Sequence, residues 1–183
     1  MASCDTVLLH DAFCDANRRS YNEDRVIAKV PWREQPHPWD TPEAVILAVD
    51  GHGGAQAADF CVENWETCLT GSLECVYREK RLSGEREWAE AARQTLQRLH
   101  EDYIASAVDT PRRRSGACVA LLIVLKDFFV HAHVGDCRVT LIHGVKVVQL
   151  TRDHRPDSPT EQRRVEACVV ECSKYRIPVR FVL

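Results

Sequence analysis

A carboxylate, an imidazole and three glycines lie within five consecutive residues, Asp50-Gly51-His52-Gly53-Gly54. Glycine allows the backbone to adopt a positive φ, so a loop of this kind can bring main-chain and side-chain oxygens up to a small ion or a phosphate. A tight turn that carries a solvated aspartate explains the same residues equally well. The loop by itself leaves both interpretations open.

Other carboxylates also lie where predicted strands begin or end. Glu23 and Asp24 directly precede one predicted strand, and Asp136 follows another. If these strands share a sheet edge, Glu23, Asp24, Asp50 and Asp136 converge. Carboxylates that converge repel one another and stay ionised together when a divalent cation neutralises them. Ligation by oxygen alone selects Mg²⁺ or Mn²⁺ over zinc or copper.

Arg19 precedes Asp24 by five residues. Its planar guanidinium could hold a phosphate through two hydrogen bonds at the same site. A solvent-exposed polar loop explains each of these charged residues taken singly, so their convergence is the point that a structure must test.

The elements that position these residues follow from the apolar pattern. The run 44–49 is short and rich in β-branched residues, which indicates a strand covered on both faces. Helical spacing predicts a helix over 55–78, with a possible break near Gly71, and a second helix over 85–107. The segment 31–42 contains four prolines and two tryptophans, and we expect an exposed connection there.

The remaining predicted elements are mostly strands, at 6–9 and 26–30, and then a meander of four strands at 117–125, 128–134, 138–142 and 145–150. A short helix is expected over 159–167. Strands, a helix pair and then antiparallel strands predict an α+β domain in which helices pack on sheets. At 183 residues the chain has room for one domain with a sizeable core.

Composition excludes several classes of protein. A net charge of −3 and a pI near 6.2 argue against a general nucleic-acid binder. No segment has the length of a membrane span, and the N-terminus lacks the pattern of a signal peptide. The nine cysteines include no C-x-x-C pair, which predicts reduced thiols and not a zinc site. We therefore expect a cytoplasmic protein, with the nucleus as an additional location, that binds neither nucleic acid nor membrane.

Five segments, in this order, resemble the metal-dependent protein Ser/Thr phosphatases of type 2C: RRSYNEDR (18–25), VDGHGG (49–54), SGACVALLIV (115–124), HVGDCRVTLI (133–142) and LTRDHRPDSPTEQRRVEA (150–167). The resemblance covers almost the whole chain. Two segments carry variants, since Cys137 stands where the family usually has serine and Ala117-Cys118 replaces the usual Ser-Thr. We expect these changes to affect packing more than chemistry.

The resemblance implies a β-sandwich of two antiparallel sheets flanked by helix pairs, and it assigns a role to each candidate residue. Asp50 would bridge two Mg²⁺ or Mn²⁺ ions, the Gly51 carbonyl would bind one of them, and Asp136 would bind a third ion more weakly. Glu23 would hold an ion through water, with Asp24 supporting the water shell. Arg19 would grip the substrate phosphate.

The implied reaction is hydrolysis of a phosphomonoester by a metal-activated water, on phosphoserine and phosphothreonine proteins in signalling. His52 would protonate the leaving oxygen; a histidine that only orients a metal-bound water is the alternative. No cysteine nucleophile is required. We expect a monomer.

The resemblance weakens after Ala167. Cys168-Val169 stand where the family has a glycine pair, and two later metal-binding aspartates have no counterpart before Leu183. We therefore expect a single, C-terminally incomplete domain over 1–183, arising as a fragment, a truncated gene product or a splice product. Such a chain should bind Mn²⁺ weakly and turn over little phosphopeptide. A catalytically inactive, phosphatase-like regulatory or binding module remains the alternative.

Overall fold

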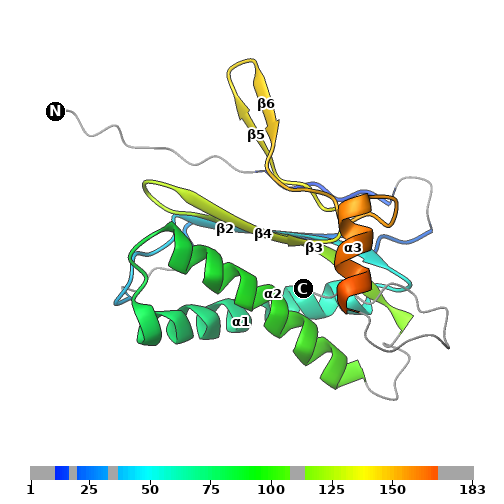
Figure 1. Ribbon diagram of the computed structural model, residues 1–183, viewed down its shortest axis with the longest axis horizontal. Coiled ribbons are helices and arrows are strands. Elements are labelled where there is room, and N and C mark those ends of the chain that lie inside the picture. The colour runs from blue at the N-terminus through cyan, green and yellow to red at the C-terminus, as the bar shows by residue number, and fades with distance from the viewer. Residues whose placement is uncertain (1–10, 17–19, 33–36, 108–113, 169–183) are drawn as a thin grey trace.

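A computed structural model of the chain describes residues 11–16, 20–32, 37–107 and 114–168. Its centre is an antiparallel four-stranded sheet in the order β1-β2-β3-β4 (Figure 1). The strands are β1 (Arg25–Lys29), β2 (Ala44–His52), β3 (Gly116–Val124) and β4 (Phe129–Val134). In an antiparallel sheet, neighbouring strand ends carry residues from distant parts of the sequence, and here Asp50 of β2 lies opposite Cys118 of β3.

Two long helices, α1 (Gln56–Lys80) and α2 (Glu85–Ala107), pack on one face of this sheet (Figure 1). Alternate residues of the central strands point at the helices, as the two-residue period of a strand requires. Leu47 and Leu121 are among the fully buried side chains of the strands, and Leu73 and Trp88 are among those of the helices. One continuous apolar core therefore joins the sheet to both helices.

The first turn of α1 is capped by Ser115, the residue that directly precedes β3. Ala55 supplies no side-chain cap to the helix, but the Ser115 hydroxyl accepts the Ala57 N–H at 2.9 Å. The same hydroxyl lies 2.7 Å from the hydroxyl of Tyr103 near the end of α2. Ser115 thus links both helices to the sheet at the end where the polar loop lies.

A separate hairpin follows the sheet. Strands β5 (Thr140–His143) and β6 (Lys146–Gln149) pair only with each other, and all of their residues are exposed. The hairpin stands away from the sheet on the side opposite α1 and α2, and α3 (Pro159–Cys168) lies at one end of the sheet (Figure 1). The side chains exposed on the hairpin include Ile142, Val145 and Val147.

The α+β class with antiparallel sheets and helices is confirmed, and so are the bounds of α2. Two predictions were wrong at element level. The expected meander is interrupted, since β4 and β5 belong to different sheets. The helix predicted to break near Gly71 is continuous through that residue, because packing on α2 and the sheet outweighs the helix-weakening effect of one glycine.

Two other expectations need correction. The strand predicted over 44–49 continues to His52, because β3 supplies hydrogen-bonding partners as far as Gly116. The segment 31–42 was expected to be exposed, but Trp32 is buried in the core at 4% exposure. The strand predicted over 6–9 lies outside the described residues. None of the described helices has the length and apolar character needed to cross a membrane.

Candidate metal and phosphate site

Gly51 and Glu23 approach each other at the end of β2. A Cβ on Gly51 would lie 2.4 Å from the Glu23 carbonyl oxygen, so only glycine permits this contact. Glu23 is 7% exposed, and its Oε1 accepts the Gly54 N–H at 2.5 Å. The backbone after β2 therefore holds the Glu23 carboxylate against the Asp50–Gly54 loop.

The main chain of Asp24 is tied to β1 and α1. Its N–H donates to Asn22 Oδ1 at 2.8 Å, and its carbonyl oxygen accepts from Arg25 Nη1 at 2.8 Å. Arg25 in turn forms an ion pair with Asp59 of α1 at 2.7 Å. The segment that carries Glu23 and Asp24 is thus fixed at the start of β1.

Asp50 and Asp136 both lie beside the thiols of Cys118 and Cys137. A Cβ on Gly135, whose φ is +85°, would lie 2.2 Å from Cys118 Sγ, so the turn that carries Asp136 closes directly onto β3. Burial raises the pKa of Cys118 to about 11 and that of Cys137 to about 12. The negative charges of Asp50 and Asp136 contribute to both increases in pKa, so both carboxylates act electrostatically on the same pair of thiols.

His52 lies at the last position of β2, opposite Gly116. Its ring covers the backbone of Gly116, because a Cβ there would lie 2.5 Å from His52 Nε2. The imidazole is exposed, so a ligand at the loop has access to it. Gly53 and Gly54 adopt the positive φ values that the sequence predicted for this loop, at 70° and 119°.

The structure thus brings together two parts of the predicted site: Glu23 with the 51–54 loop, and Asp50 with Asp136. These parts are continuous through the Asp50–Gly51 peptide, and their donors are oxygens, which suit Mg²⁺ and Mn²⁺. Among the described residues, however, no group of three or more His, Cys, Asp or Glu side chains is arranged to hold a metal ion. Arg19 lies outside the described residues. The metal ligand set remains a prediction.

Two residues that support the loop had no signal in the sequence pattern. Ser115 caps α1 from another element, and the His154 N–H donates to the Gly135 carbonyl oxygen at 2.9 Å. Both lie within segments that carry the family resemblance, but their spacing from Asp50 and Asp136 does not reveal the contacts. Only tertiary structure shows them.

Comparisons with known proteins point to one family over most of the chain. The family model for protein phosphatase 2C matches residues 11–177. Probable protein phosphatase 2C 30 of Arabidopsis thaliana is 29% identical over 160 residues, which are 86% of this chain and 38% of that relative. Probable protein phosphatase 2C 8 of Oryza sativa subsp. japonica is 28% identical over 189 residues, covering 94% of this chain and 44% of the relative. The chain therefore spans about two-fifths of the length of these relatives.

Solved structures show the same fold. A sex-determining protein from C. elegans is 23% identical with a TM-score of 0.67, and the likeness covers 81% of this chain and 35% of that one. A serine/threonine phosphatase from S. agalactiae is 20% identical with a TM-score of 0.56, covering 84% of this chain and 57% of that one. At this level of identity the likeness concerns the fold alone.

Proposed function

Because the chain belongs to the protein phosphatase 2C family, we propose that it acts as a metal-dependent phosphatase on phosphoserine and phosphothreonine proteins. The observation that carries this proposal is that Cys118 lies opposite Asp50 and against Gly135, the neighbour of Asp136, while Glu23 lies against Gly51. Glu23, Asp50 and Asp136 come from three separate segments, and a bound cation would offset the charge of the carboxylates that ligate it.

The chain's own oxygens would hold the cations. Asp50, Asp136 and the Gly51 carbonyl are the proposed direct ligands, and Glu23 and Asp24 the proposed water-mediated ones. Bound Mg²⁺ or Mn²⁺ would supply positive charge to the phosphoryl oxygens and acidify a water molecule. The thiols of Cys118 and Cys137 stay protonated, because burial and the two carboxylates raise their pKa. They would therefore contribute neither a nucleophile nor a negative charge.

The remaining proposed roles concern the substrate. Arg19 would bind the phosphate through its guanidinium, whose fork matches two phosphoryl oxygens. His52 would donate a proton to the departing serine or threonine oxygen, which otherwise leaves as a poor, charged alkoxide. Exposure of the His52 ring at the end of β2 supports this role.

We also propose the finer architecture, a single β-sandwich domain with a second sheet over the face of the first that α1 and α2 leave uncovered. That face carries alternate residues of the central strands, among them Ile46 of β2 and Leu122 of β3, which are only partly buried. An apolar sheet face normally packs on another layer. The exposed β5–β6 hairpin would belong to that layer.

A catalytically inactive binding module is the second candidate. It is favoured by the absence, among the described residues, of three side chains arranged to hold a metal. In that case the chain would bind phosphopeptides, or a protein partner, without hydrolysing them.

Phosphate release from a ³²P-labelled phosphoserine peptide, measured with excess Mn²⁺, separates the candidates. The phosphatase proposal expects slow release by the 183-residue chain, abolished by chelation of the metal and by Asp50→Asn. Release that survives Asp50→Asn would contradict the proposed site. Peptide binding with no release, and no effect of Asp50→Asn on that binding, would favour the binding module.

A further inference from the structure

Three imidazoles gather beside the turn that carries Asp136. His131 and His133 lie two positions apart on β4 and so share one face of the sheet, with ring centroids 6.5 Å apart. His154 comes from the segment after the hairpin, and its ring centroid lies 4.8 Å from that of His133. The cluster thus joins the end of the sheet to the segment that leads into α3.

His154 and Gly135 are hydrogen-bonded in both directions. The His154 N–H donates to the Gly135 carbonyl oxygen at 2.9 Å, and the Gly135 N–H donates to His154 Nδ1 at 3.3 Å. A nitrogen that accepts a hydrogen bond carries no proton, so His154 must be neutral with its hydrogen on Nε2. A proton on Nδ1 would turn the acceptor into a donor that faces another donor.

His133, the neighbour of His154, is held by a hydrogen bond of its own. Its Nε2 lies 2.8 Å from the Arg152 carbonyl oxygen, and a carbonyl only accepts, so this nitrogen carries hydrogen. A charge on either ring would be repelled by a charge on the other at the observed separation. We call His133, His154 and Gly135 the clasp.

The charged groups around His154 do little to stabilise its protonated form. The acidic neighbours are Asp153 and Glu161, but Asp153 is paired with Arg138 at 2.6 Å and Glu161 with Arg164 at 2.5 Å. Burial lowers the pKa of His154, and the positive charges of His133 and Arg164 lower it further, against the opposing effect of Glu161 and Asp153. The site therefore favours the neutral ring.

We propose that His154 is a positioning residue whose neutral imidazole holds the Gly135–Asp136 turn on the sheet, and that protonation of the imidazole opens the clasp. The inference goes beyond the proposed phosphatase function and needs no turnover for its test. Only its consequence for the reaction, displacement of the Asp136 carboxylate in acid, rests on that function.

The direction of the pH dependence follows from which state binds the proton. When the turn is open, His154 is solvated and has an ordinary affinity for protons. When the clasp is closed, the affinity of His154 for a proton is lower. Acid therefore draws the equilibrium toward the open turn, beginning below about pH 6.5. One titrating group changes an equilibrium by up to about tenfold per pH unit.

Hydrogen–deuterium exchange of a peptide that covers the Gly135 amide measures this opening directly in the metal-free chain. After correction for the intrinsic pH dependence of exchange, the opening equilibrium should rise by up to about tenfold per pH unit between pH 6.5 and pH 5. In His154→Gln the side-chain oxygen can still accept from the Gly135 N–H but does not titrate, so the rise should be lost.

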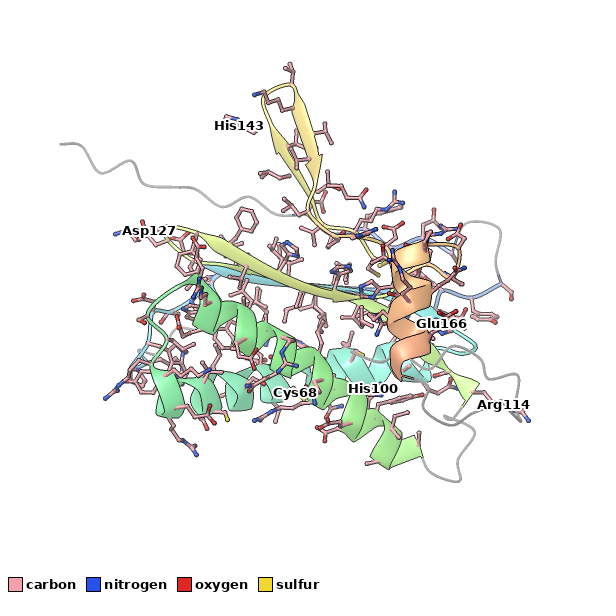
Figure 2. The ribbon with its side chains drawn as sticks, viewed as in Figure 1. Cys68, His100, Arg114, Asp127, His143 and Glu166 are labelled. Carbon is pink, nitrogen blue, oxygen red and sulfur yellow. The ribbon has the colours of Figure 1, made fainter. Side chains whose placement is uncertain are left out.

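The matched control is His143→Gln, which removes an imidazole near the tip of the hairpin, away from α3 (Figure 2). This variant should keep the pH dependence of the wild type. A flat profile in the wild type, or the same slope in His154→Gln as in the control, would overturn the proposal. Neither result depends on phosphatase activity, so the clasp and the proposed function can fail separately.

A spectrum of the wild-type chain gives a second test that needs no folded variant at position 154. Nitrogen-15 NMR of the histidine rings at pH 7.5 should show His154 neutral with an unprotonated Nδ1, assigned by its contact with the Gly135 amide. A protonated Nδ1 at that pH would contradict the clasp even if His154→Gln failed to fold.

Discussion

Among single residues, Gly51 shows how the candidate site depends on the absence of a side chain. Replacing it with alanine would place a methyl group 2.4 Å from the Glu23 carbonyl oxygen. Because both partners are backbone, neither can move aside cheaply. Gly51→Ala should lower the free energy of unfolding by about 2 kcal/mol or more, measured by urea denaturation.

Gly84→Ala is the matched control, because its added Cβ would meet only Glu87 Oε2, at 3.4 Å. Gly84 directly precedes α2, where alanine is a poorer cap than glycine, so that change should cost less than about 1 kcal/mol. Equal effects of the two substitutions would mean that the close approach of Gly51 to Glu23 does not exist in solution.

Thiol reactivity gives a second test at this scale. Burial raises the pKa of Cys61 to about 12, so little reactive thiolate forms at pH 8 while the chain is folded. Iodoacetamide should label the exposed Cys14 far faster than Cys61, and urea should abolish the difference. Mass mapping of the labelled peptides measures both rates. Equal labelling of Cys14 and Cys61 in the native chain would show that the core around α1 is open.

The candidate site was predictable in its residue types but not in its contacts. The loop residues at 50–54 predicted a backbone with positive φ because glycine makes that conformation cheap, and Gly53 and Gly54 adopt it. Nothing in the spacing indicates that Glu23 Oε1 accepts the Gly54 N–H, since that hydrogen bond joins residues that only the sheet brings together.

At the scale of elements, the start of α1 depends on Ser115. Ser115→Ala removes the acceptor of the Ala57 N–H and the partner of the Tyr103 hydroxyl. The loss should cost about 1–2 kcal/mol of unfolding free energy. A double-mutant cycle with Tyr103→Phe should show coupling between the two positions, because they share one hydrogen bond. Strict additivity would argue that the hydroxyls do not interact.

Element bounds were predictable where burial follows a regular period. The apolar stripe of α2 predicted Glu85–Ala107, and those are its bounds. The end of β2 was missed because Asp50, Gly51 and His52 have low strand propensity, while pairing with β3 determines their conformation. The same reasoning explains the false meander, since spacing alone does not show whether consecutive strands share a sheet.

For the molecule as a whole, acid should destabilise the fold in two steps. Burial lowers the pKa of His131 and His154, so the unfolded chain binds their protons first. Their contribution to stability is full above about pH 6.5 and is lost as the pH falls below it. The hydrogen bond from Arg93 lowers the pKa of Glu90 to about 2, so its smaller, surface contribution disappears between about pH 4.5 and pH 2.

Urea denaturation at pH 7.5, 5.5 and 3.5 measures both steps. The unfolding free energy should decrease at each lower pH. A chain that is more stable at pH 5.5 than at pH 7.5 would mean that these histidines are charged in the folded state.

The central claim is that the chain's carboxylates bind a divalent cation at the end of β2, and Mn²⁺ binding followed by electron paramagnetic resonance tests it most directly. The wild type should bind Mn²⁺ with a dissociation constant on the order of millimolar. Asp50→Asn should weaken binding by at least about tenfold, and Asp136→Asn by less. Asp127→Asn is the control, because Asp127 lies in the β3–β4 turn, at the end of the sheet opposite to Asp50 (Figure 2). This variant should bind Mn²⁺ as the wild type does. Equal binding by the wild type, Asp50→Asn and Asp127→Asn would contradict the account.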